Sequence, residues 1–140
     1  MKIQIITKEQ ECVEGVSKIV VSSESLEELQ SVVDNSCSLV MLESTIDYLD
    51  YKKSFECLNL AIKKTRINGD IVINGLCFDK IANSYLNQEL EIYEINEKIY
   101  SCSSMQSYDN IIFLLEDSNF LISTFTHSGP YYQIKAKRMG

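Results

Sequence analysis

The apolar residues of this chain gather into short runs separated by polar turns, a pattern typical of buried strands. Runs of strand length cover Ile3–Ile6, Lys18–Val21, Ser38–Leu42 and Asp70–Asn74. The run at Ser38–Leu42 is continuous, which predicts a strand covered on both faces of its sheet. Two further β-prone runs, Phe120–Phe125 and Tyr131–Ala136, flank His127-Ser-Gly-Pro130, whose turn residues predict an antiparallel hairpin.

Helical spacing of apolar residues fills the segments between these runs. One face of a first helix carries Leu26, Leu29, Val32 and Val33. The sequence Ser25–Glu28 fits a capping box that starts this helix, which is expected to stop near Asp34. Further helices are predicted over Tyr48–Arg66, over Asp79–Leu90 and from Ser107 through Leu115. The stretch Glu91–Ser103 leaves two alternatives open, a strand pair or an irregular insertion.

A tight glycine turn separates the second of these helices from the strand at Asp70–Asn74. Its sequence, Thr65-Arg-Ile-Asn-Gly-Asp-Ile-Val-Ile73, runs from a helix end into a buried strand, as in the middle of an open α/β sheet. Gly69 is expected to adopt the left-handed conformation of a helix C-cap. The stretch resembles the late core of class I S-adenosylmethionine-dependent methyltransferases, where a helix ends in Leu-Lys-Pro-Gly-Gly and leads into a strand.

Most of the chain is similar to that family in pattern rather than in identity. The likeness is carried by Lys2–Ile6 as the first strand, Val13–Val16 after the first loop, Met41–Ile46 as the fourth strand, and Phe120–Arg138 as the closing hairpin. The family's third strand is mostly missing, because the span from Asp34 to Ser38 is very short. The resemblance implies an α/β fold for residues 1–140: one domain, a trimmed Rossmann-like three-layer sandwich with a C-terminal antiparallel hairpin.

The positions at which the family binds its cofactor differ in this chain. The loop after the first strand reads Thr7-Lys-Glu-Gln10, without the glycines that let backbone N–H groups approach the ligand. Ser22 and Ser23, followed by Glu24, stand where the family has an acid for the ribose hydroxyls. These differences predict that neither S-adenosylmethionine nor any other cofactor is bound, and they weigh against enzymatic activity.

A divergent S-adenosylmethionine-dependent methyltransferase is the alternative interpretation. Under it, the resemblance implies that the cofactor contacts come from Thr7, Lys8, Ser23 and Glu43. Glu43 matches the acid of the family's "LEHI" segment at the end of the fourth strand. It is also interpreted as an exposed charge at the rim of the sheet.

Charge and composition narrow the range of partners. The formal net charge of −7 comes from dispersed acids, which excludes nucleic acid as a partner that needs a basic surface. No apolar run approaches transmembrane length, so the expectation is no membrane contact and a cytoplasmic protein. Five cysteines without a C-x-x-C pair and one histidine, His127, predict small apolar thiols in a reducing compartment and no zinc site. His127 is interpreted as a solvated turn residue, and Asp47 as a surface charge.

These observations favour a non-catalytic methyltransferase-like module that acts as a structural or protein-interaction component, for example in a phage particle. Its expected partner is a protein or a second copy of itself. The missing strand would expose the side near Ile19 and Val21, and Tyr131 and Tyr132 would offer a second, aromatic surface. The alternatives are the divergent methyltransferase and a small binding or regulatory domain of unrelated ancestry.

Overall fold

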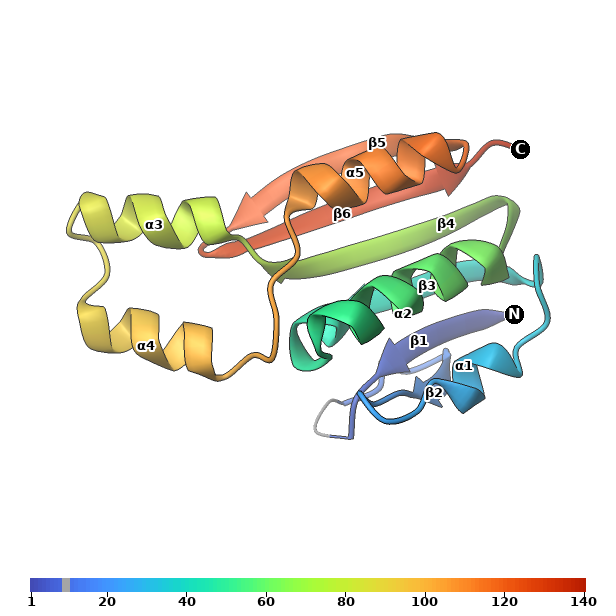
Figure 1. The fold of residues 1–140 in the computed structure, drawn as a ribbon. Helices are drawn as coiled ribbons and strands as arrows, with labels where there is room; N and C mark the ends of the chain where they lie inside the picture. The colour runs from blue at the N-terminus through green and yellow to red at the C-terminus, as the bar shows by residue number, and fades with distance from the viewer. Residues whose placement is uncertain (9–10) are drawn as a thin grey trace.

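The computed structural model describes residues 1–8 and 11–140 of the chain. Within them one sheet is formed by β1 (Lys2–Ile6), β2 (Ser17–Val20), β3 (Cys37–Glu43), β4 (Thr65–Leu76), β5 (Phe120–Ser128) and β6 (Tyr131–Arg138) (Figure 1). The helices are α1 (Glu27–Gln30), the 3-10 helix η1 (Thr45–Tyr48), α2 (Tyr51–Lys64), α3 (Phe78–Leu86), α4 (Ile92–Tyr100) and α5 (Tyr108–Asp117). In this part of the chain no helix has both the length and the apolar character that crossing a bilayer requires.

The sheet has the order β2-β1-β3-β4-β6-β5. Its first four strands run parallel, and β6 and β5 form an antiparallel hairpin beside β4. The predicted α/β class, with a Rossmann-like sheet and a C-terminal antiparallel hairpin, is therefore confirmed. Within the described residues β2 is an edge strand, as expected for a sheet that lacks a strand beyond it.

One face of the sheet carries the hydrophobic core. Side chains alternate along a strand, so Val40 and Leu42 of β3 point to one face and Leu39 and Met41 to the other. Val40 and Leu42 are fully buried in one cluster with residues of α1, α2 and α5, whereas Leu39 and Met41 are only half-buried. The helices α1, α2 and α5 thus cover the same face, in front of the strands in Figure 1.

The opposite face is covered by a loop beside β1. The buried Gln4 side chain accepts a hydrogen bond from Val13 N–H at 2.6 Å and donates one to Glu11 O at 3.4 Å. Over β3, β4 and β6 this face carries half-buried Leu39 and Met41 and exposed Lys135. The prediction that the strand at 38–42 is covered on both faces is confirmed for the helix side alone.

Two helical segments differ from their prediction. The first helix ends at Gln30, and Glu28 does not close a capping box: its Oε2 accepts a bond from Val20 N–H at 2.7 Å and so satisfies the edge strand β2. The undecided stretch 91–103 contains the helix α4, so both alternatives were wrong. Its residues Ile92, Ile95 and Ile99 have helical spacing, but only Ile95 is buried, which weakened the signal.

Gly69 is required for a different reason from the one predicted. The helix α2 ends at Lys64 and the strand β4 begins at Thr65, so Gly69 lies inside a strand. The left-handed residue is its neighbour Asn68, with φ of 66°, and the expected left-handed cap at Gly69 is wrong. A Cβ at Gly69 would lie 2.8 Å from the carbonyl oxygen of Cys37, so the glycine permits close backbone approach between β3 and β4.

Candidate functional site

A polar cavity of about 310 Å³, here called the β1–β2 cavity, lies at the carboxyl ends of the first two strands. It is lined by Thr7, Lys8, Val21, Ser22, Ser23, Glu24 and Tyr48. The lining residues come from the loop after β1, the turn after β2 and the end of η1. Open α/β sheets bind their ligands outside the carboxyl ends of the strands, so the cavity lies where a ligand is expected.

Hydrogen bonds hold the two strand ends together at this cavity. Val21 N–H donates to Ile6 O at 2.8 Å, which extends the parallel pairing one residue past β2. Ser22 and Ser25 then form a tight turn with reciprocal backbone bonds of 2.9 and 3.2 Å. Ser23 Oγ accepts a bond from Asp50 N–H at 3.0 Å, which ties the turn to the start of α2. The hydroxyl groups after β2 are therefore positioned by three elements of the fold.

Three of the four residues predicted for the alternative, cofactor-binding interpretation come together here. Thr7, Lys8 and Ser23 line the β1–β2 cavity. Glu43 is not among the lining residues; it is half-buried at the end of β3. Of the loop predicted after the first strand, Glu9 and Gln10 lie outside the residues that the structure describes.

The turn after Glu43 leads the chain away from the cavity. Ser44 has a left-handed backbone, with φ of 58°, and its N–H donates to Asn74 Oδ1 at 2.6 Å. The next residue, Thr45, donates its hydroxyl to Ile5 O at 2.6 Å. These bonds connect the end of β3 to its neighbours β1 and β4. The helix η1 follows and places Tyr48 at the cavity.

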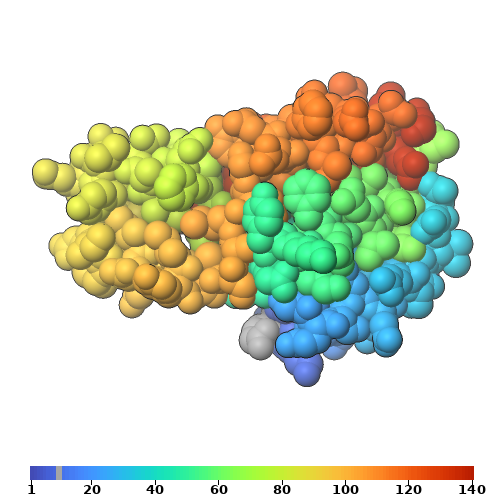
Figure 2. Space-filling model, viewed as in Figure 1, coloured from blue at the N-terminus to red at the C-terminus, as the bar shows by residue number. Residues whose placement is uncertain are grey.

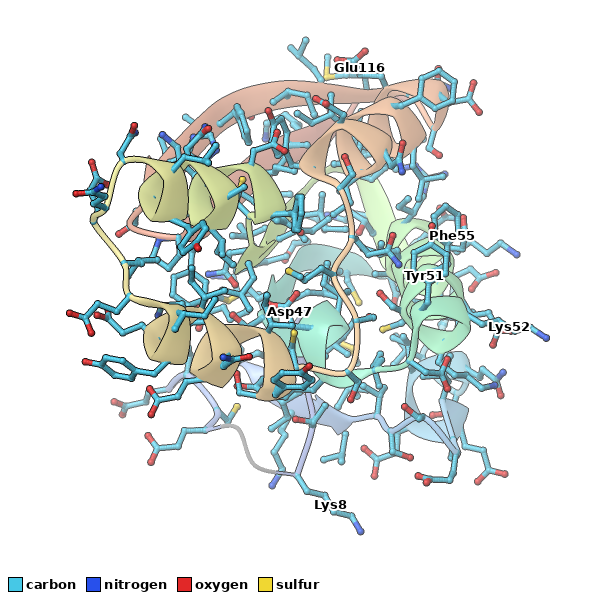
Figure 3. All side chains as sticks on the ribbon, turned by 60° about the vertical axis from the view of Figure 1, so that its left-hand side comes forward. Lys8, Asp47, Tyr51, Lys52, Phe55 and Glu116 are labelled. Atoms are coloured by element: carbon cyan, nitrogen blue, oxygen red, sulfur yellow. The ribbon has the colours of Figure 1, made fainter. Side chains whose placement is uncertain are left out.

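The lining groups of the β1–β2 cavity are chemically varied. Thr7 is buried, whereas Lys8 extends outward from the end of β1 (Figure 3). Ser22, Ser23 and Glu24 supply two hydroxyls and a carboxylate, and the Tyr48 ring is 42% exposed. A carboxylate and hydroxyls can bind the hydroxyls of a sugar, an exposed ring can stack on a planar group, and an ammonium can pair with an acid.

A second, more apolar cavity of about 420 Å³ lies between the end of β4 and the start of α5. Its lining consists of Cys77, Phe78, Asp79, Met105, Gln106, Ser107 and Tyr108. The buried Gln106 donates from Nε2 to Ser54 Oγ at 3.3 Å, while its Oε1 has no partner among the described residues. Sequence reasoning missed this cavity, because its walls come from two separated segments without a shared motif.

His127 contacts two residues that line this second cavity, Cys77 and Tyr108. Its Nε2 lies 3.8 Å from Cys77 Sγ, and its ring meets Tyr108 edge-on with 5.8 Å between the centroids. The same ring packs against Phe125, with the centroids 4.9 Å apart. The histidine is exposed, as expected, but it belongs to an aromatic cluster rather than to a freely solvated turn.

Asp47 is buried, and the interpretation of this residue as a surface charge is wrong. Its Oδ2 accepts a bond from Leu76 N–H at 2.9 Å, while Oδ1 has no partner among the described residues. Burial raises the pKa of the Asp47 carboxyl to about 7, only partly offset by the Leu76 bond. Figure 3 shows Asp47 inside the molecule, between η1 and α4.

Tyr132 is also buried, although it was predicted to form a surface with Tyr131. Its hydroxyl has no partner in the described part of the chain. A Cβ at Gly75 would lie 3.0 Å from both that hydroxyl oxygen and Asp47 Oδ1, so the glycine leaves room between the two polar groups. Val21, which was predicted to lie beside Ile19 on the exposed side of the sheet edge, is buried as well.

Three of the five cysteines, Cys37, Cys57 and Cys77, are buried, and all five are free thiols. Burial raises the pKa of the Cys57 thiol to about 12. In the described residues no three histidine, cysteine, aspartate or glutamate side chains gather in a way that could hold a metal ion. The three buried cysteines therefore contribute to packing, as the sequence predicted, whereas Cys12 is exposed.

The sequence itself matches no family model, and it matches no curated protein. Solved structures do match. A SAM-dependent methyltransferase from Archaeoglobus fulgidus superimposes with a TM-score of 0.61 at 19% identity, over 98% of this chain and 86% of that one. A SAM-dependent methyltransferase from Methanosarcina mazei gives 0.55 at 14% identity, over 93% and 70%. An O-methyltransferase family protein from Burkholderia thailandensis gives 0.61 at 13% identity over 89% of this chain, which spans only 36% of that protein.

The first two of these matches cover nearly the whole of this chain. The chain has a class I methyltransferase-like fold. The resemblance inferred from the sequence is thus confirmed at the level of the fold. The prediction that it takes no cofactor is contradicted, because the matched structures are those of S-adenosylmethionine-dependent enzymes.

Proposed function

We propose that this methyltransferase-like chain binds S-adenosylmethionine in the β1–β2 cavity. The observation that carries the proposal is the convergence of Thr7, Lys8 and Ser23 on one polar cavity at the carboxyl ends of the first two strands. Two of the named solved structures, from Archaeoglobus fulgidus and Methanosarcina mazei, are of S-adenosylmethionine-dependent methyltransferases, which indicates the ligand class. S-adenosylmethionine carries an adenine, a ribose and an amino acid, and it supplies an electrophilic methyl group.

The absence of glycine after β1 does not close this cavity. The argument against a cofactor assumed that side chains would occupy the space that glycine leaves free. The side chain of Thr7 is buried, and about 310 Å³ remains beside it. Thr7 and Lys8, the described residues of this loop, therefore leave a cavity at the strand ends without a glycine.

The lining residues fit the parts of the ligand. The Glu24 carboxylate and the Ser22 hydroxyl follow the second strand, where they can accept and donate hydrogen bonds to a ribose. The half-exposed Tyr48 ring offers a stacking surface to adenine. Lys8, at the end of the first strand, can pair with the ligand's carboxylate.

Isothermal titration calorimetry with S-adenosylmethionine and S-adenosylhomocysteine tests the proposal. We expect a Kd in the micromolar range for the unchanged chain. Glu24→Gln should weaken binding about tenfold or more, because a hydrogen bond to a charged group is lost. The matched control is Glu27→Gln, which changes an exposed acid of α1 that does not line the cavity. Absence of binding at millimolar ligand, or equal affinities of the two variants, would overturn the proposal.

We also propose a protein-interaction role, independent of ligand binding. The observation that favours it is a concentration of exposed apolar side chains on the segment between β4 and α5. Six large apolar residues of this segment are exposed: Phe78, Tyr85, Leu86, Ile92, Tyr93 and Tyr100. A concentration of exposed apolar side chains is typical of sites of association. No observation supports a phage particle as its setting.

A further inference from the structure

The sheet face opposite the helices contains a basic groove. Two cross-strand rows form its floor, Lys2–Leu39–Asp70–Lys137 and Gln4–Met41–Val72–Lys135, as the registers of β1, β3, β4 and β6 show. A cavity of about 440 Å³ lies over these rows, and Arg66 adds a further cation to its wall. We define the basic groove by Leu39, Met41 and Val72 as its apolar floor and by Lys2, Arg66 and Lys135 as its rim.

The charge of the basic groove is opposite to that of the protein. The chain carries a net charge of −7, yet the only acid in the groove lining is Asp70, and Lys137 neutralises it at 3.3 Å. None of the ion pairs among the described residues involves Lys2, Arg66 or Lys135. An apolar floor surrounded by free cations favours an acidic amphipathic segment as the group that binds there.

The segment 78–103, here called the helical lobe, has the complementary character. It contains α3 and α4, which pack on a small separate core of Leu76, Ile81 and Ile95. The helical lobe carries five acids and two lysines. One of those lysines, Lys98, lies over the ring of Tyr131 at 5.9 Å.

The outer surface of α4 combines the two features that complement the basic groove, namely apolar residues for its floor and acids for its rim. Ile92, Tyr93 and Tyr100 are exposed on it, and Glu94 and Glu97 accompany them on the same helix. None of these acids forms an ion pair within the described residues. Figures 1 and 2 show the lobe, in yellow, projecting beyond the body of the domain, so that it extends past the sheet rather than over it.

We propose that α4 of one copy docks in the basic groove of a second copy of this chain. The contact supplies a helix to the open sheet face and covers exposed apolar residues of α4. It places Tyr93 and Tyr100, which share one side of the helix, against the apolar floor, and Glu94 and Glu97 beside them against the rim cations. The two surfaces belong to different parts of the chain, so the association is either a closed pair with two such contacts or a longer assembly. This inference names the partner for the interaction role proposed above and does not depend on the β1–β2 cavity.

Reciprocal charge reversal tests the contact. The groove variant carries Arg66→Glu and Lys135→Glu, and the lobe variant carries Glu94→Lys and Glu97→Lys. Sedimentation velocity should show that the unchanged chain associates across the micromolar range and that each variant alone is monomeric, because like charges meet in every contact. An equimolar mixture of the two variants should associate again, because the acidic lobe meets an unchanged groove and the basic lobe meets the acidic groove.

Matched controls change charge equally on other exposed surfaces. Lys52→Glu with Lys63→Glu controls for the groove variant, and Glu27→Lys with Glu116→Lys controls for the lobe variant. Both controls should associate like the unchanged chain, and circular dichroism should show every variant folded. A monomeric unchanged chain, association of either variant alone, or a mixture that stays monomeric would overturn the inference. Titration of the groove variant with S-adenosylmethionine separates it from the proposed ligand binding, which this variant should retain.

Discussion

The two faces of the sheet differ in what covers them, and the difference originates in the connections between strands. Helices occur in the connections after β2, β3 and β4, and α1, α2 and α5 all pack on one face. The connection from β1 to β2 contains no helix in its described residues, and its loop covers only the region beside Gln4. One face therefore has a hydrophobic core, and the other has the basic groove.

This contrast shows how a methyltransferase-like sheet can lose cover on one side and keep its fold. The core residues of β3 and β4 on the helix side, such as Val40 and Ile73, are fully buried. On the other side Leu39 and Met41 are half-buried and Asp70 is paired with Lys137, although Val72 between them is buried. Stability should therefore depend on the helix side, and association on the open side.

The largest expected effect concerns the buried carboxyl of Asp47. Because its pKa is raised from 3.8 to about 7, the folded chain holds a proton that the unfolded chain releases between these values. Stability from this group is present at low pH and is lost as pH rises from about 4 to 7. Asp47→Asn should remove the loss and make the variant more stable than the unchanged chain at pH 8, by up to about 4 kcal/mol.

Urea unfolding from pH 4 to pH 8 measures this difference. The control on the open face is Asp70→Asn, which leaves Asp47 in place and should keep the pH dependence of the unchanged chain. If Asp47→Asn loses stability with rising pH as steeply as the unchanged chain does, the carboxyl of Asp47 is not the group responsible.

A second prediction compares two leucines of the same strand. Leu42 is fully buried against the helices, and Leu39 is half-buried in the basic groove. Leu42→Ala should reduce the free energy of unfolding by about 3 kcal/mol, through lost burial and a cavity, and Leu39→Ala by about 1 kcal/mol or less. The comparison is made by denaturant unfolding at low protein concentration. Equal losses would show that both faces of β3 are covered to the same extent.

Much of the fold could be predicted because its signals are local. Continuous apolar runs gave the parallel strands, and Gly129 and Pro130 gave the hairpin turn. The helix α4 was missed because only Ile95 and the half-buried Ile99 face the small core. Its other apolar residues, Ile92, Tyr93 and Tyr100, are exposed and obscure the helical periodicity. A helix that carries apolar residues on its exposed side is difficult to recognise from the periodicity of apolar residues in the sequence.

The candidate site was predicted in part. Thr7, Lys8 and Ser23 could be placed together, because they follow strands whose carboxyl ends meet at one edge. The burial of Asp47 and Tyr132 could not be predicted, since it depends on β4 and β6 meeting η1, which no local pattern encodes. The prediction of no cofactor counted missing glycines, and the S-adenosylmethionine-dependent enzymes among the matched structures contradict it.

The smallest expected effect lies at the start of the pairing between β3 and β4, beside the groove residue Arg66. Gly69→Ala should destabilise the chain by about 1–2 kcal/mol, because the new Cβ would lie 2.8 and 2.9 Å from the carbonyl oxygens of Cys37 and Arg66 and the backbone must shift.

The adjacent variant Asn68→Gly is the control, because it changes a position with a left-handed backbone and adds no side-chain atom to the contact between the strands. Asn68 has φ of 66°, so glycine relieves its strain while adding freedom to the unfolded chain, and the net change should stay within about 0.5 kcal/mol. Thermal unfolding of both variants measures the difference. A harmless Gly69→Ala would show that the two strands separate at no cost, and the groove wall at Arg66 would then be adaptable rather than fixed.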